Sequence, residues 1–236
     1  MKQFLNLEPT VNQTFRLIGY GKRGNLSARL EESYRAESEG DFERACCIRY
    51  EAFQDILSSL PDDENSTVEL DRNHANTLAA METILASAID NYLACDYELS
   101  AAQAELLIDL DSEDPLEATP LLSLCYVALG EWECLEDIIT DLGDKSAICP
   151  LVLLIADFAN NRPFDAQNIK ALLRFKEFVA ELLLTEHATD REYLQSINSN
   201  TPSKQAKARE LYLRCEPVLN LYPGLLTALK NAVRGD

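Results

Sequence analysis

The sequence predicts an all-α protein built from stacked antiparallel helical hairpins and closed by a C-terminal helical cap. Apolar residues recur at helical spacing, as in Leu30 and Tyr34, or Leu99, Ala102 and Leu106. The 236 residues include only eight glycines and nine prolines, and few segments alternate in the way of strands. A turn pattern also recurs along the chain. Together these observations favour helices of about ten to twenty residues joined by short turns.

Turn-forming residues divide the chain into an N-terminal segment (1–23), about four hairpins (24–183) and the cap (184–236). Gly, Pro, Asp and Asn gather at the expected breaks. The breaks lie at residues 38–41, 60–67, 94–96, 111–115, 129–131, 142–150, 160–163 and 187–202. Apolar stripes in 209–222 and 224–233 indicate that the last segment packs as a cap.

The turn pattern recurs at nearly constant offsets. Tyr97 and Trp132 lie 35 residues apart, and so do Pro115 and Pro150. A small residue can bend the chain between two helices, and we expect the following aromatic residue to fill the junction with the next pair. The turn residues of the four predicted copies are Gly40, Phe42, Tyr97, Gly130, Trp132 and Phe164.

Several segments resemble a known repeat family. EGDFERACCIRYEAF and ALGEWECLEDIITDL resemble the turn and second helix of tetratricopeptide repeats. AQAELLIDLDSEDPLEATPLLSLCYVALGEWE and AKARELYLRCEPVLNLYPGLLTAL look like a divergent bacterial tetratricopeptide-like module. The resemblance implies an α-solenoid in which the first helix of each hairpin lines a concave, partner-binding face. The residues expected on that face are Glu82, Leu85, Ile89, Tyr92, Glu117, Leu121, Leu124 and Asn160.

The chemistry of that face implies the kind of partner. Family members that grip a terminal carboxylate use lysines and asparagines, whereas this chain has Leu30, Tyr34, Leu85 and Ile89 at the matching places. A carboxylate clamp is therefore not expected. An apolar groove with acidic margins suits a basic or amphipathic protein segment. The alternative is that neighbouring hairpins bury these apolar residues.

The charge is concentrated in the middle of the chain. Of the net charge of −19, nearly all lies in residues 61–160, which hold 22 acidic and two basic side chains. Such a field favours basic partners and disfavours direct contact with nucleic acid or an anionic membrane. The simpler interpretation is that these are the solvated outer faces of acidic helices.

The sequence contains no recognisable catalytic or cofactor motif. GxxxxGK[ST], GxGxxG, HExxH and GxSxG are all lacking. Of the two histidines, His74 is expected to be exposed and His187 to cap a helix end. DLDSED is expected to be an acidic turn that begins the next helix rather than a calcium loop. We therefore expect no catalytic residue, no metal and no cofactor.

Cysteine use and the start of the chain bear on the compartment. Seven cysteines, an odd number without a CxxC pair, are typical of reduced core thiols. The first residues lack the apolar region of a signal peptide, and no apolar window is long enough to span a bilayer. These features predict a cytoplasmic protein.

Three functions stay open at this point. The leading one is a non-catalytic interaction scaffold or adaptor whose acidic helical stack binds a basic or amphipathic protein segment. The second is an acidic chaperone or inhibitor that masks a nucleic-acid-binding protein. A metal-dependent enzyme has the least support, and the sequence does not indicate the oligomeric state.

Overall fold

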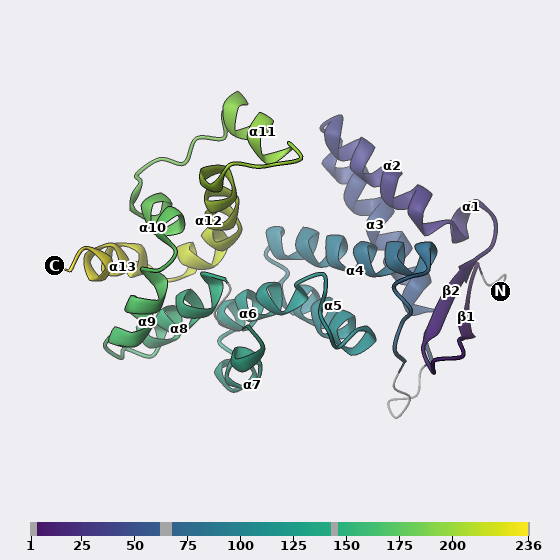
Figure 1. Cartoon of the computed structure of the whole chain (residues 1–236), viewed down its shortest axis with the longest axis horizontal. Coiled ribbons are helices and arrows are strands. Elements are labelled where there is room, and N and C mark those ends of the chain that lie inside the picture. Colours follow the sequence, from purple (N-terminus) through teal and green to yellow (C-terminus); the bar gives the residue numbers. More distant parts are fainter. Residues whose placement is uncertain (1–3, 62–67, 143–145, 236) are drawn as a thin grey trace. The chain divides into compact units, whose positions relative to one another are not determined.

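The protein is largely helical. The computed structural model describes residues 4–61, 68–142 and 146–235, and this part holds 13 helices and one two-stranded antiparallel sheet (Figure 1). The helical prediction is confirmed in this coarse form, but the all-α prediction is wrong for the N-terminal segment, which forms the sheet. The chain divides into two compact units, unit 1 (residues 1–125) and unit 2 (residues 126–236). The boundary falls inside helix α6 (Ala118–Leu129).

A β-hairpin opens unit 1. Strands β1 (Leu5–Pro9) and β2 (Phe15–Gly19) pair antiparallel. Leu17 is fully buried, and its backbone is tied to helix α4: its N–H donates to Thr77 Oγ1 (3.0 Å), and Asn76 Nδ2 donates to its carbonyl (3.1 Å). Apolar residues alternate with polar ones in β1, as a sheet with one buried face requires, whereas β2 follows the pattern only from Phe15 to Leu17.

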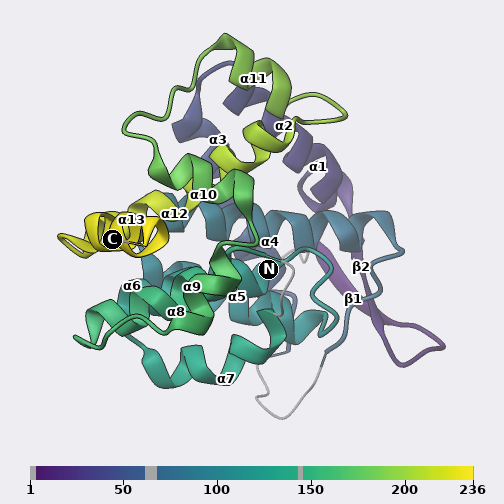
Figure 2. The same cartoon turned by 60° about the vertical axis from the view of Figure 1, so that its left-hand side comes forward.

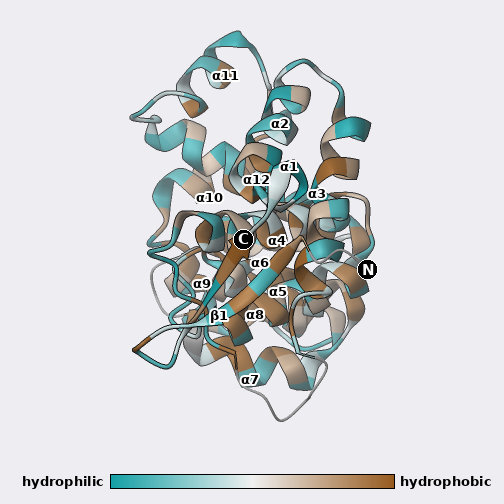
Figure 3. Ribbon diagram, turned by 90° about the vertical axis from the view of Figure 1, so that its right-hand side faces the viewer, coloured by the Kyte–Doolittle hydropathy of each residue, from teal (hydrophilic) through white to brown (hydrophobic). Residues whose placement is uncertain are grey.

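The helices of unit 1 pack on their neighbours in sequence. Helix α2 contacts both α3 and α4, α3 contacts α4, and α4 contacts α5 (Figure 1). Figure 3 shows hydrophobic residues along α4 and α5, which form much of the core, whereas α2 is more hydrophilic. The bounds are α1 (Gly21–Gly24), α2 (Leu26–Ser38), α3 (Phe42–Leu57), α4 (Ala75–Leu93) and α5 (Tyr97–Leu110).

Unit 2 contains the end of α6 and seven further helices of the described chain. Helix α8 contacts α7 and α9, and α12 contacts α10, α11 and α13 (Figure 2). Tyr222 Oη donates to the Val127 carbonyl (2.6 Å), which ties the end of α12 to α6. The bounds are α7 (Trp132–Leu142), α8 (Ile148–Ala159), α9 (Ala166–Leu172), α10 (Lys176–Leu183), α11 (Arg191–Ile197), α12 (Lys204–Leu221) and α13 (Leu225–Arg234).

Four pairs of helices lie where hairpins were predicted, and their turns share one backbone geometry. A residue with positive φ lies one or two positions beyond the end of each first helix, and the N–H of the residue after it donates to the carbonyl five positions earlier at 2.8–2.9 Å. This pattern is the Schellman motif, which satisfies carbonyls at a helix end. The four residues with positive φ are Gly40 (82°), Cys95 (63°), Gly130 (75°) and Asn161 (53°).

The aromatic turn residues differ in their burial. Tyr97 is buried and packs edge-on against Tyr92, with ring centroids 5.6 Å apart, while Trp132 is half-buried. Phe42 is 64% exposed, so the prediction that it fills a junction is wrong. The buried stripe of α3 begins one turn later, at Ala45.

The alignment of the fourth copy on Phe164 is also wrong. Phe42, Tyr97 and Trp132 each begin the second helix of their pair, but α9 begins at Ala166, after Phe164. Pro163 follows Arg162 in this turn and disfavours a helical conformation before it, which lengthens the connection. Phe164 stacks instead on Phe158 of α8, at a centroid distance of 6.4 Å.

Candidate functional site

The residues predicted to line a partner-binding face fall into three groups. Tyr92, Leu121 and Leu124 are buried in the core, with exposures of 0%, 4% and 0%, so their assignment to an open face is wrong. Neighbouring helices cover them because α4 and α6 carry apolar residues around most of their circumference. Glu117 and Asn160 are exposed but lie at helix ends. Glu82, Leu85 and Ile89 are half-buried and stay partly open to solvent.

The last three residues form one stripe on α4. At 100° per residue, positions 82, 85 and 89 fall within a narrow sector of the helix. Tyr34 of the adjacent α2 is 50% exposed, and the charge of Glu82 acts on it. We call Tyr34, Glu82, Leu85 and Ile89 the α2–α4 face.

A buried arginine lies beneath this face. Arg49 of α3 is 6% exposed, and its guanidinium lies 5.2 Å from the ring centroid of Tyr34. It donates to Asp90 Oδ1 (2.9 Å), to Ser33 Oγ (3.2 Å) and to Glu37 Oε2. Tyr34 and these three hydrogen-bond partners come from α2 and α4, so Arg49 of α3 joins three helices at the level of Tyr34.

The acidic groups around Arg49 outnumber it. Burial raises the pKa of Asp90, although Arg49 opposes the shift, and Asp90 Oδ2 is buried without a hydrogen bond in the described chain. Burial also raises the pKa of Tyr34; Arg49 lowers it, while Glu82, Glu37 and Asp90 raise it further. Burial and Asp90 also raise the pKa of the Cys46 thiol. The phenol of Tyr34 and the thiol of Cys46 therefore stay neutral near pH 7.

Unit 2 has its own buried polar centre, at Glu181 of α10. Its carboxylate, 5% exposed, accepts from Arg209 Nε (2.7 Å) and pairs with His187 Nδ1 (2.8 Å). Burial disfavours the ionised form, but these two partners outweigh it and lower the pKa of Glu181. His187 does not cap a helix end: α10 ends at Leu183, and the imidazole stacks on Tyr212 at a centroid distance of 3.7 Å.

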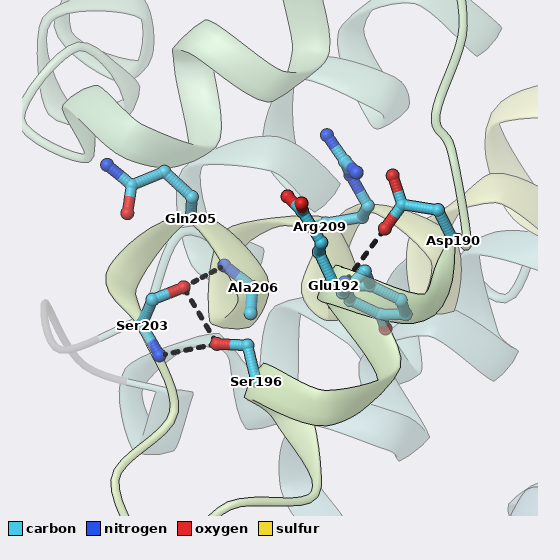
Figure 4. Close-up of a pocket in the computed structure, with 8 residues that line it drawn as sticks. Asp190, Glu192, Ser196, Ser203, Gln205, Ala206 and Arg209 are labelled. Atoms are coloured by element: carbon cyan, nitrogen blue, oxygen red, sulfur yellow. Dashed lines mark hydrogen bonds between the residues drawn. The ribbon is translucent and has the colours of Figure 1, made fainter.

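A pocket of about 310 Å³ lies between α11 and α12, beside Arg209 (Figure 4). Ser203 holds its edge: its N–H donates to Ser196 Oγ, and its own Oγ accepts from the Ala206 N–H, both at 3.1 Å. The lining combines two carboxylates, one guanidinium that Glu181 already pairs, and neutral hydroxyl and amide groups. This composition points to no particular ligand.

The remaining predicted polar groups have structural roles. Asp114 of the acidic turn accepts from the N–H groups of Ala118 (2.6 Å) and Thr119 (2.9 Å), which confirms that this turn begins the next helix. His74 is half-buried rather than exposed, with Nδ1 3.1 Å from Thr77 Oγ1.

In residues 4–61, 68–142 and 146–235, no cluster of three or more His, Cys, Asp or Glu has metal-binding geometry. Across the same ranges, no helix combines the length and apolar character needed to cross a membrane.

No protein-family model matches the chain, and neither a curated protein nor a solved structure matches it. The resemblance to tetratricopeptide repeats stays a prediction from the sequence.

Proposed function

We propose that this chain is a non-catalytic protein-interaction module whose α2–α4 face binds a basic, amphipathic segment of a partner protein. The observation that carries the proposal is the composition of this face. Leu85 and Ile89 supply apolar surface on one stripe of α4, and Glu82 lies in the same stripe. An amphipathic helix that carries Lys or Arg would bury its apolar side on the leucine and isoleucine and place a cation near the glutamate.

The contacts of unit 1 support the finer architecture that this function needs. Helix α2 contacts both its own partner α3 and the first helix of the next pair, α4. This is the neighbour pattern expected when one hairpin stacks on the next, so we propose a tetratricopeptide-like stack in which α2 and α4 share a face. The acidic balance of the chain would speed the encounter with a basic partner and make binding sensitive to salt.

Two buried cysteines bear on where such a module works. Cys125 and Cys215 are buried and form no disulfide. Because thiols persist in a reducing compartment, we place the module in the cytoplasm.

The test is affinity capture from native cell extract with wild type, Glu82→Lys and Glu136→Lys. Glu136 is exposed on α7, and its replacement changes the net charge as much as Glu82→Lys does. We expect one partner that wild type and Glu136→Lys retain, that Glu82→Lys loses, and that elutes as salt rises. Equal capture by all three proteins would contradict the proposal. Displacement of the partner by DNA or RNA would instead indicate that the chain masks a nucleic-acid-binding protein.

A further inference from the structure

We propose that the open side of the Tyr34 ring is the anchor for a lysine or arginine side chain of the bound segment, with Glu82 as its counter-ion. This inference rests on the function proposed above and names the chemistry that the α2–α4 face recognises. It assigns the contact to one aromatic ring and one carboxylate, from two neighbouring helices.

The first step is the geometry of the ring. Tyr34 is half exposed, although the guanidinium of Arg49 lies over its ring, 5.2 Å from the centroid. Because Arg49 is itself buried, it covers the inner side of the ring, and the exposure must come from the outer side and edge. An aromatic ring offers a negative face to a cation on either side.

The second step is that the ring is held in place. Arg49 is bonded to Ser33 and Glu37 on the helix of Tyr34 and to Asp90 on α4. The ring therefore rests on a cation that three partners restrain. A preorganised aromatic side chain loses little conformational freedom on binding, which is the usual character of an interface anchor.

The third step is the charge around the ring. Glu37, Asp90 and Glu82 all act on Tyr34, against the single guanidinium of Arg49. Glu37 and Asp90 are already bonded to Arg49, whereas Glu82 has no ion-pair partner within the described residues. The excess negative charge beside an exposed ring fits a cationic side chain and disfavours an anionic one.

Phe42, another exposed aromatic residue of unit 1, lacks these features. Phe42 is 64% exposed, more than Tyr34, but no cation lies over its ring among the described residues. It also begins α3 rather than lying on α2 or α4. Phe42 therefore serves as the matched control for the loss of an exposed aromatic ring.

The experiment uses the full chain and two synthetic helical peptides. Both peptides are amidated 14-residue amphipathic helices with leucine on one face; one carries lysine on the polar face and the other glutamine. Their affinities are measured by isothermal titration calorimetry for wild type, Tyr34→Leu, Tyr34→Phe, Phe42→Leu, Glu82→Gln and Glu82→Lys. Far-UV circular dichroism and melting curves establish that each variant is folded.

We expect the lysine peptide to bind wild type with one-to-one stoichiometry. Tyr34→Leu keeps an apolar side chain but loses the π face. It should therefore lower the affinity for the lysine peptide about tenfold, which is the effect of losing a partly desolvated cation–π contact. Glu82→Gln should weaken it about threefold, as for an exposed ion pair. Tyr34→Phe and Phe42→Leu should bind as wild type does, and the glutamine peptide should not distinguish wild type from Tyr34→Leu.

The outcomes separate the two proposals. If the lysine peptide binds wild type and Tyr34→Leu equally while Glu82→Lys abolishes binding, the anchor role of Tyr34 is overturned and the interaction function stands. If neither peptide binds wild type, or if Glu82→Lys leaves binding unchanged, the proposed function falls as well. Equal weakening by Tyr34→Leu and Phe42→Leu would also overturn the anchor, because it would show a general loss of apolar surface.

Discussion

Replacing Arg49 with methionine tests whether the buried network under Tyr34 holds unit 1 together. Methionine keeps an unbranched apolar stem and removes every donor of the guanidinium. Ser33 keeps its own bond to the Leu30 carbonyl (2.7 Å), and Glu37, whose side chain is 46% exposed, can turn to water. Asp90 is the partner that cannot replace the lost hydrogen bond with water, because its side chain is only 16% exposed and its Oδ2 already lacks a hydrogen bond in the described chain.

The expected loss of stability follows from the carboxylate of Asp90, which Arg49→Met leaves without its cationic partner. Removing one partner of a fully buried ion pair costs about 3–5 kcal/mol. Since Asp90 keeps some access to water and can take up a proton, we expect Arg49→Met to cost about 2–4 kcal/mol of the free energy of unfolding of unit 1. Asp90→Asn removes the charge that burial disfavours, so it should cost less, about 1 kcal/mol.

Urea denaturation followed by far-UV circular dichroism gives the stability, and native-state hydrogen exchange of α2 and α3 peptides assigns the change to unit 1. Trp132 fluorescence reads unit 2 separately. The double variant should cost at least about 1 kcal/mol less than the sum of the two single changes, because no buried charge remains unpaired. Strict additivity, or a cost of Arg49→Met under about 1 kcal/mol, would refute the reasoning.

Three further predictions concern other elements. The pKa of Glu181 lies below its ordinary value of 4.5, so the stabilisation by its ionised carboxylate is complete above pH 4.5 and is lost as pH falls through the folded pKa. Below pH 4.5 the melting temperature should therefore drop more steeply with falling pH for wild type than for Glu181→Gln. Parallel curves for the two proteins would contradict this prediction. Trp132→Ala should cost about 2 kcal/mol in urea unfolding, below the value for a fully buried Trp, because the side chain is half-buried. Gly40→Ala should cost about 1 kcal/mol at a positive φ, whereas Cys95→Gly, which relieves the same strain, should stabilise by about 0.5 kcal/mol; the same sign for both would show that φ does not decide these turns.

The sequence predicted the helices well because their periodicity is local. The turn between α4 and α5 was placed correctly although Cys95 replaces the usual glycine, since Asp96 still caps α5 by accepting from the Leu99 N–H (3.3 Å). The β-hairpin was missed even though a signal existed. Leu5 and Leu7 alternate with Asn6 and Glu8, a period of two that a search for helical spacing passes over.

The predicted site was only partly recoverable from the sequence. Helix α6 has apolar residues on all sides, so its pattern cannot say which of them neighbouring helices cover, and Leu121 and Leu124 were assigned to the wrong environment. The partial exposure of Glu82 was easier to predict, because it is an acidic residue between the apolar positions of α4. The register between α2 and α4, which brings Tyr34 near Glu82, depends on tertiary packing and left no sign in the sequence.

The two buried polar centres did leave a sign, which lies in charged residues on apolar stripes. Arg49 falls on the buried stripe of α3 with Ala45, Ala52 and Ile56, and Glu181 falls between Phe178 and Leu182 of α10. A charge at such a position must be paired inside the fold, so each residue predicts a partner from another segment. The partners themselves, Asp90 and Arg209, lie 41 and 28 residues away and could not be read from the spacing.

Arg49 makes stability and recognition depend on the same network. If it only joined three helices, Arg49→Met would destabilise unit 1 and leave peptide affinity unchanged in the fraction that stays folded. Under the proposed anchor role, the same change also frees the ring of Tyr34 from the cation beneath it. The ring must then be ordered at the moment of binding, which lowers affinity even in fully folded protein. Arg49→Met also removes a positive charge beside the ring, which by itself favours the lysine peptide, so the two variants are compared at high salt, where exposed charges are screened. Under that condition Arg49→Met should weaken binding of the lysine peptide more than Asp90→Asn does, because Asp90→Asn keeps the guanidinium under the ring.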